Sequence, residues 1–495
     1  MSKYYIMKNI SKIKLSLFAG MLIFYSSCTK DFDKMNVNPN LATVVPATNV
    51  LGSAQLSSMY TLFGTRLACY YTGAWSGMIS APDYEYRVDI NNDMWKSMYI
   101  NMTYAVDAMR LAKSETNDNL YAAALTFKAY NAQKTTDMWG DIPYSEAFQL
   151  EKGALYPKYD SQEEVYTAIL AELKTAADMF SATGKPIGAG DFFLKGDISK
   201  WRKFCNSLRL RVAIRMSSVV AAKASLIIKE VLGDPTKYPI MTSNSDNAYW
   251  YLPGTVPDQE IWYESMGTVG GAPKTTGWRL QQPFIDALQN NNDPRLPVYA
   301  DKNSWGKYSG HRFGPNEKSD TMNNNFNRSH IGDRFMNDPK GFIPYMNCAE
   351  VYFCLAEAYQ RGLATGDARV AYETGITKSC EESNRVAAGD IATFLARPEV
   401  AWGSGTTTNL QKIALQKWIC LFKQSVEAWS EARRTDVPLL TNITVNYASS
   451  HNRPPFRMAY ADEEKTLNTN FPFNVVEKDI FYGTQVWWDK RTGVK

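Results

Sequence analysis

The sequence predicts an all-α protein built from tetratricopeptide-like helix pairs and interrupted by one long, irregular, aromatic-rich insertion. Over most of the chain, apolar residues recur every three to four positions, which is the period of an amphipathic helix. This period fades over 233–345, where Gly, Pro, Asn and Trp become frequent. We therefore expect one domain over 46–495, with a helical scaffold at 46–232 and 346–435 around the loop-rich insertion.

The composition is that of a globular protein with ample core. The chain has 495 residues, of which 45% are apolar and 21% charged. The net charge of +4 is small for this length, and no block of Lys and Arg follows the N-terminal segment. Because nucleic-acid binding requires a concentrated basic surface, we set this class of function aside.

The first 28 residues have the layout of an export signal. A start with four lysines is followed by an apolar run over 15–25 and by two serines before Cys28. The run is about 11 residues long, whereas a membrane-spanning helix needs roughly 20. Residues 1–27 are therefore predicted to be a removable signal peptide, and Met7 is a second candidate start.

The end of this segment resembles a bacterial lipoprotein signal, in which the cysteine becomes the first mature residue and carries acyl chains. Tyr25 stands where leucine is usual. The resemblance implies lipidation of Cys28 by palmitate or similar chains, and two or more chains give a stable anchor. The acidic start at 29–33 resembles the export signal of surface lipoproteins in Bacteroidetes, and 28–45 would form a lipidated tether. An ordinary signal with a chance cysteine is the alternative.

The first scaffold segment contains six predicted helices. One of them stops at the Gly-Asp-Ile-Pro turn of 140–143, because proline disfavours helix in the residue before it. Another opens with a capping box between Ser161 and Glu164. The six predicted ranges are 48–68, 93–112, 119–139, 161–183, 198–219 and 221–232.

Helices resume after the insertion. A helix over 348–361 ends at Gly362, and Asp367 opens a second one, so the two should form an antiparallel hairpin. Small residues such as Gly375 would let the two axes approach closely. A single long helix is predicted over 410–433, and 436–495 reads as an irregular C-terminal segment.

Six cysteines remain besides Cys28, and we expect them to be free, buried thiols. No Cys-x-x-Cys occurs, and most of the six lie among apolar residues at helical spacing. Disulfides are permitted in an exported protein and stay an alternative. The six are Cys69, Cys205, Cys348, Cys354, Cys380 and Cys420.

The residue patterns of common enzyme classes are missing. The three histidines lie far apart without metal-ligand spacing, and there is no Gly-x-Ser-x-Gly elbow or phosphate-binding loop. Glu427 and Glu431 stand at ion-pair spacing from the arginines of 433–434, and Asp293-Pro-Arg reads as a turn. We therefore expect no enzyme activity, no catalytic residue, no metal and no cofactor. A helical glycoside hydrolase with paired carboxylates is the alternative.

Aromatic residues are the candidates for ligand binding. Flat rings can stack on the apolar faces of sugars, while polar side chains at the rim bind the hydroxyls. Each ring could instead belong to the core, and the tryptophans at 402, 418, 429, 487 and 488 are assigned to packing. The platform candidates are Trp75, Trp262, Trp278, Trp305 and Tyr308, followed by Trp95, Trp250, Tyr251 and Tyr84.

Several segments, in order along the chain, resemble the SusD/RagB family of nutrient-binding outer-membrane lipoproteins. The resemblance runs from Cys28 to the C-terminus, with Ala461 where the family usually has proline. The final Val-Trp-Trp-Asp of 486–489 resembles the tail of the SusD-like subfamily. The other matching segments are 140–147, 293–296, 349–359, 416–418, 427–435 and 457–464.

This resemblance implies a helical body with tetratricopeptide-like pairs and a looped ligand-binding part. It also implies a partner, a TonB-dependent SusC-like barrel over which the lipoprotein acts as a hinged lid. We expect a lipid-anchored outer-membrane protein that faces the exterior, binds an oligosaccharide and hands it to the barrel. The alternatives are an oligopeptide-binding lid, the surface hydrolase named above, and an assembly scaffold without a small ligand.

Overall fold

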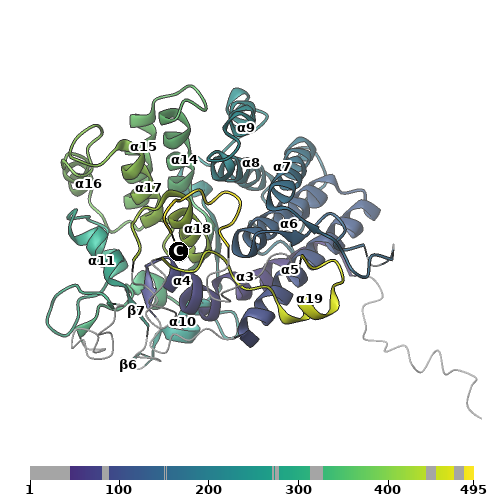
Figure 1. Ribbon diagram of the computed structural model, residues 1–495, viewed down its shortest axis with the longest axis horizontal. Coiled ribbons are helices and arrows are strands. Elements are labelled where there is room, and N and C mark those ends of the chain that lie inside the picture. Colours follow the sequence, from purple (N-terminus) through teal and green to yellow (C-terminus); the bar gives the residue numbers. More distant parts are fainter. Residues whose placement is uncertain are drawn as a thin grey trace, which may run out of the picture. The chain divides into compact units, whose positions relative to one another are not determined.

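Long helices form both halves of the scaffold (Figure 1), and the prediction of an all-α, tetratricopeptide-like fold is confirmed. The computed structural model describes residues 45–80, 88–149, 151, 153–269, 272–273, 278–312, 327–441, 453–472 and 484–494. The predicted signal, Cys28, nearly all of the tether and Tyr84 lie outside these residues. The chain from Ala47 onwards forms one compact unit.

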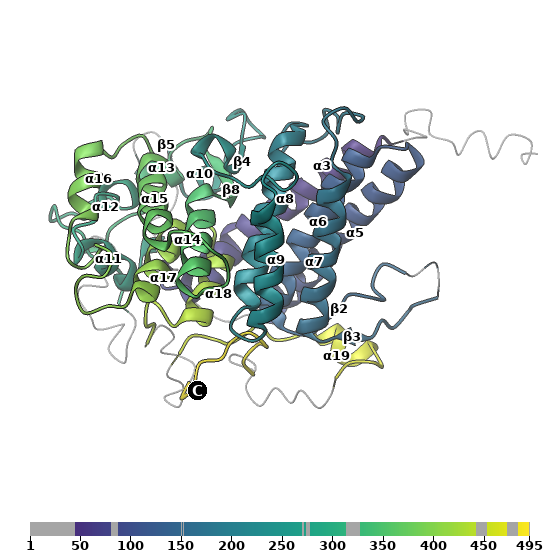
Figure 2. The same cartoon turned by 90° about the horizontal axis from the view of Figure 1, so that it is seen from above.

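Six long helices make up the first half of the scaffold, in the predicted places. Each packs against the next one along the chain, so that they stand side by side (Figure 2). The first is shorter than predicted and is followed by the π-helix η1 (Arg66–Tyr71) and by α4 (Thr72–Trp75). The six are α3 (Ala47–Phe63), α5 (Val88–Ser114), α6 (Asp118–Trp139), α7 (Gln162–Met179), α8 (Ile198–Met216) and α9 (Ala221–Gly233).

Local sequence sets several of these helix ends. The predicted capping box of α7 is confirmed, because the Ser161 amide donates to Glu164 Oε2 at 2.8 Å and the Glu164 amide donates to Ser161 Oγ at 3.3 Å. The α6 helix ends at Trp139, where Gly140 takes a positive φ of 87°. Strands β2 (Ile142–Pro143) and β3 (Tyr159–Asp160) then pair beside the turn.

The predicted hairpin after the insertion is confirmed as α14 (Cys348–Gln360) and α15 (Ala368–Glu381), which pack against each other. A Cβ on Gly375 would meet the ring of Phe353 at 2.7 Å, so the close approach of the two helices requires glycine there. The short helices α16 (Ala388–Leu395) and α19 (Asp462–Leu467) were not predicted.

The prediction of one helix over 410–433 is wrong. The chain forms α17 (Asn409–Cys420) and α18 (Ser425–Thr435), with a break at Lys423, whose φ is +70°. The buried ammonium of Lys423 donates to Glu260 Oε1 at 2.9 Å and to the carbonyl of Phe342 at 2.9 Å. Contacts with the insertion therefore fix a backbone conformation that a continuous helix cannot contain.

The insertion contains several short elements between its loops. Strands β4 (Ala248–Tyr251) and β8 (Phe342–Met346) pair antiparallel, and Tyr251 stands opposite Phe342. Strand β7 (Arg279–Leu280) pairs with β1 (Ile79–Ser80) of the first scaffold segment, and β5 (Thr268–Val269) pairs with β6 (Ala272–Pro273). The helical elements are η3 (Asn244–Asp246), α10 (Ile261–Met266), α11 (Gln282–Gln289), α12 (Leu296–Tyr299) and α13 (Asp333–Met336).

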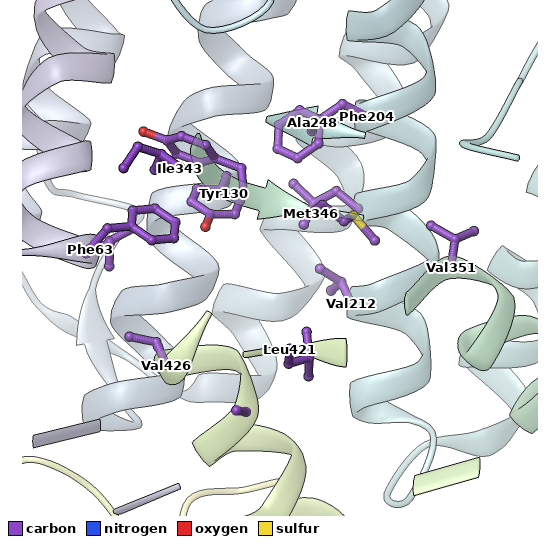
Figure 3. Close-up of a cluster of buried hydrophobic side chains, with 14 of the residues drawn as sticks. Phe63, Tyr130, Phe204, Val212, Ala248, Ile343, Met346, Val351, Leu421 and Val426 are labelled. Atoms are coloured by element: carbon purple, nitrogen blue, oxygen red, sulfur yellow. The ribbon is translucent and has the colours of Figure 1, made fainter. Parts of the chain in front are cut away.

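The core lies where the insertion meets both sets of scaffold helices, the first helix set (α3 and α5–α9) and the second helix set (α14, α15, α17 and α18). Strand β8 is buried along its whole length, and side chains from α3, α6, α8, α14 and α18 surround it (Figure 3). The predicted free thiols are confirmed: the six cysteines from Cys69 to Cys420 are all free and buried. Within the described ranges, no helix is both long enough and apolar enough to cross a membrane.

A network of buried ion pairs ties the helix sets together. Glu431 contacts Arg434 at 2.8 Å, as its spacing predicts, and also Lys417 at 3.2 Å. Glu427 pairs instead with Lys134 and Arg215, which lie on α6 and α8. Both glutamates are almost completely buried and enclosed by cations, so their role is structural.

The predicted turn at 293–296 is also structural. Asp293 Oδ2 lies 2.5 Å from Arg295 Nη2, and both side chains are buried. Arg295 Nη1 also donates to Ser379 Oγ on α15 at 2.8 Å. The turn thereby joins the insertion to the second helix set.

Candidate ligand-binding site

Two of the five platform candidates belong to the core. Trp75 is 1% exposed, and its ring centroid lies 4.9 Å from that of Trp429. Trp262 is 0% exposed, and its Nε1 donates to the carbonyl of Phe63 at 2.9 Å. The prediction is therefore wrong for Trp75 and Trp262, because packing from distant segments covers both rings and leaves no face for a ligand.

The other three candidates lie on segments that the backbone joins. Three hydrogen bonds between backbone amides and backbone carbonyls make these joins. They run from His311 to Leu280 at 2.8 Å, from Ser329 to Ser309 at 2.7 Å and from Asp301 to His330 at 3.1 Å. These bonds bring together the stretches that carry Trp278, Trp305 and Tyr308. Trp305 is 55% exposed, whereas Trp278 and Tyr308 are half-buried against the core.

A tight turn presents Trp305 to solvent. The buried side chain of Asn303 accepts from the amides of Trp305 and Lys307, each at 3.0 Å, and the Asn303 amide donates to the carbonyl of Lys307 at 2.8 Å. Gly306 takes a positive φ of 71°, which the turn needs. The loop is thus fixed before any ligand arrives.

Besides this turn, the structure contains a groove of about 710 Å³. The two are connected through the chain, because the segment that pairs with 300–301 leads directly into α13. The volume falls within the usual range for small-molecule sites. Its walls combine two aromatic rings with charged and amide side chains; those used below are Tyr251, Phe342, Asp333, Arg334, Asn337 and Arg385.

The aromatic wall of the groove is held by stacking. The centroid of the Phe342 ring lies 4.8 Å from that of Tyr249 at an interplanar angle of 13°. The Arg334 guanidinium lies over the Phe342 ring, 4.7 Å from its centroid. Tyr251 lies 6.0 Å from Phe342 and is 57% exposed. The groove therefore offers one open ring, that of Tyr251, beside a fixed one.

Polar contacts fix the remaining wall. Arg334 Nη2 lies 2.8 Å from Glu382 Oε1, and Asn337 Nδ2 donates to Asp333. The amide of Thr268 donates to Asn337 Oδ1 at 2.9 Å, which joins α13 to β5. These side chains can donate to or accept from ligand hydroxyl groups without a change in the backbone.

The electrostatics link the turn to the groove. Burial and then Asp333 raise the pKa of Asp301 to about 6, against the effect of Arg385. Asp301 in turn contributes, after burial, to the raised pKa of Tyr308. Burial, followed by Arg279, lowers the pKa of His330 to about 4, so this imidazole is neutral at pH 7. Across the residues for which coordinates are described, no group of three His, Cys, Asp or Glu could hold a metal ion.

Sequence patterns missed most of the groove. Tyr251 was a second-rank candidate, but Arg334, Asn337, Phe342 and Arg385 carried no signal. They come from separate segments, and each residue type is ordinary in a loop or at a helix end. Of the other candidates of the second rank, Trp95 and Trp250 are buried, and Tyr84 lies outside the described residues.

Comparison with known proteins gives the family. A family model described as SusD-like, starch-binding and associating with the outer membrane matches residues 39–461. No curated protein matches the sequence.

Solved structures with the same fold cover nearly the whole chain. A chitin-binding protein is 25% identical, with a TM-score of 0.76 over 90% of this chain and 100% of its own. A chitin-binding SusD homolog from Flavobacterium johnsoniae is 27% identical, with a TM-score of 0.73 over 90% and 97%. A SusD homolog from Bacteroides uniformis is 25% identical, with a TM-score of 0.74 over 89% and 99%. Since the family model spans most of its length, the chain belongs to the SusD-like family.

Proposed function

We propose that this protein binds an oligosaccharide at the cell surface and hands it to a TonB-dependent outer-membrane transporter. The observation that carries the proposal is the exposed Trp305 on a fixed turn, together with the open ring of Tyr251 in the groove. The two are joined by the backbone bonds of 300–301 to the segment that leads into α13. Relatives described as chitin-binding, and a family described as starch-binding, support a carbohydrate as the ligand.

The chemistry of the site fits a sugar chain. Open ring faces can stack on the apolar faces of pyranose rings, and Asn337, Asp333 and Arg385 can bond the hydroxyls. The groove is open to solvent, which suits capture of part of a longer chain. Such a site needs no covalent step, and we propose that the protein is not an enzyme.

A binding experiment tests this proposal. Calorimetry with chitohexaose and maltoheptaose would use residues 29–495, which include the whole compact unit. We expect Trp305→Ala and Tyr251→Ala each to weaken binding about tenfold, since an anchoring aromatic side chain contributes at least about 1 kcal/mol.

The matched control is Tyr156→Ala. Tyr156 is 51% exposed, close to the 57% of Tyr251, but it lies on the connection between β2 and β3. We expect this variant to bind like the wild type. Unchanged binding in both Trp305→Ala and Tyr251→Ala would contradict the proposed site.

The anchor and the transporter require their own tests. We propose that Cys28 carries the acyl chains, so labelled palmitate should enter the wild-type protein and not Cys28→Ala. A detergent extract of the native membrane should yield the wild-type protein together with a barrel of SusC type. Recovery of the wild-type protein without label, or without any barrel, would contradict the corresponding part of the proposal.

One observation favours a second function, glycoside hydrolysis. Burial and then Asp333 raise the pKa of Asp301 to about 6, which is in the range of a general acid, and such hydrolysis uses a pair of carboxyl groups. Product release from either oligosaccharide, abolished by Asp301→Asn while binding persists, would establish an enzyme. Stable oligosaccharide with all variants would exclude this second function for these substrates.

A further inference from the structure

A second hollow, of about 470 Å³, lies beside α15 and α17. Its walls come from α15, α17, the loop before α17, the segment after α11 and the segment after α18, and it shares no lining residue with the groove. Tyr372 on α15 lines this hollow, whereas Ser383, two residues past the end of α15, lines the groove. The helix from Tyr372 to Glu381 alone separates them by about 14 Å at 1.5 Å per residue.

The loop wall of this hollow is built to hold its shape. The 3%-exposed Lys412 donates from Nζ to the carbonyls of Pro398 at 3.2 Å, Ala401 at 2.5 Å and Ser404 at 2.6 Å. A Cβ on Gly405, whose φ is +70°, would lie 2.8 Å from the carbonyl of Pro398. The loop is therefore closed around one ammonium group, which keeps the hollow open without a ligand.

The lining offers neutral hydrogen-bonding groups. The side chains of Thr406, Thr407, Asn291 and Gln411 reach it from three segments. The Asn291 amide nitrogen donates to the carbonyl of Ala287, which leaves its oxygen as an acceptor, and Gln411 Oε1 accepts from the Thr408 amide at 2.9 Å, which leaves its nitrogen as a donor. Donors and acceptors without charge thus stand together in one concave surface.

Apolar and charged groups complete the chemistry. Leu415 and the 61%-exposed Leu439 supply an apolar strip. Lys412 is the one cation that the described lining contains, and its three protons are already bound to carbonyls. Asp436 faces Arg453 at 3.4 Å and Arg491 at 3.6 Å. Glu399 is a second carboxylate of the lining, and its charge acts on Lys412. An anionic ligand would find no available cation here, whereas an uncharged ligand with many hydroxyl groups fits.

We propose that this hollow is a second carbohydrate site, which binds a neutral saccharide. The inference rests on the proposed function, because it takes the same class of ligand. Two sites on one protein hold a polymer more firmly than either site alone, since the second contact forms at a high effective concentration. A long glycan should accordingly be retained more strongly than a short oligomer.

The test counts binding sites by calorimetry with chitohexaose and maltoheptaose on residues 29–495. We expect two sites per chain in the wild type. Thr407→Trp, which fills the hollow, should leave one site, and Tyr251→Ala should weaken the other. The paired change Thr406→Val and Thr407→Val removes both hydroxyls at nearly constant volume and should weaken the second site about fivefold or more.

Thr393→Val on α16 is the matched control, because it removes an exposed hydroxyl outside the lining and should change neither site. One site that is lost with Tyr251→Ala and unchanged by Thr407→Trp would overturn the second site and leave the proposed function standing. One site that responds only to Thr407→Trp would support the hollow and refute the groove. Failure of both oligosaccharides to bind the wild-type protein would overturn both proposals.

Discussion

The buried carboxylate of Glu427 should be far more important for stability than the cation that pairs with it, Lys134. Glu427 pairs with Lys134 and Arg215, and Arg211 Nε lies 3.7 Å away, all with almost no exposure. Arg215 also pairs with Asp137 at 2.9 Å and Arg211 with Glu350 at 2.6 Å, so Glu427 is one member of a larger buried network. Glu427→Gln removes one negative charge from this network and leaves an excess of buried positive charge, which costs about 3–5 kcal/mol.

Lys134 is the cation that the site can best lose. Burial, only partly offset by Glu427, lowers its pKa from 10.5 to about 8. A shift of this size corresponds to about 3 kcal/mol spent on keeping Lys134 protonated in the folded state. We therefore expect Lys134→Met to be as stable as the wild type or more stable at pH 7, although it removes one half of a buried ion pair.

The pH dependence gives this prediction a second readout. Because the folded-state pKa lies below the unfolded value, the unfolded chain binds the extra proton between about pH 8 and 10.5. The free energy of unfolding of the wild type should rise with pH in this window relative to that of Lys134→Met. Denaturant titrations of the wild type and of Lys134→Met at pH 7 and pH 9.5 measure the difference in stability at pH 7 and its change with pH.

Glu373→Gln provides the control, since it makes the same chemical change in an exposed pair, with Arg369 at 2.7 Å, and should leave stability unchanged. The reasoning is refuted if Glu427→Gln unfolds within 1 kcal/mol of the wild type, or if Lys134→Met is as damaging as Glu427→Gln.

Three further predictions follow from single side chains. The pKa of Asp301 is about 6 in the folded state and about 4 in the unfolded chain, so between these pH values the folded state binds the extra proton. The free energy of unfolding should therefore fall as pH rises from 4 to 6, and Asp301→Asn should remove this slope in denaturant titrations. Trp262→Ala should lower the free energy of unfolding by about 3–5 kcal/mol, because its ring is completely buried, while the folded fraction keeps its oligosaccharide affinity. Gly375→Ala should destabilise the protein by about 1–2 kcal/mol, since the clash with Phe353 outweighs the better helix propensity of alanine; thermal unfolding would show an unchanged or higher midpoint if this is wrong.

Features encoded within a few residues were predictable from the sequence. The capping box at Ser161 and Glu164, the turn after Trp139 and the hairpin of α14 and α15 all follow from local spacing and glycine or proline positions. The family resemblance rested on such local segments in order, and the family model that matches 39–461 bears it out.

Features that depend on distant segments were not predictable. The break at Lys423 exists because Glu260 and the carbonyl of Phe342 bind its ammonium from the other side of the core. The same holds for the aromatic residues: Trp262 and Trp305 stand in similar irregular stretches, yet one is covered by α3 and the other is turned outward by Asn303. Aromatic composition alone has no means of separating these cases.

The sequence by itself determined the helices, their hairpin order and the family, because period, caps and motifs act over one or two turns of chain. Only the tertiary structure decided which rings meet solvent and which segments form a groove or a hollow. Exposure is a property of what packs above a side chain, and here that cover comes from segments that lie far apart in the chain, such as β4 and α13 at the groove.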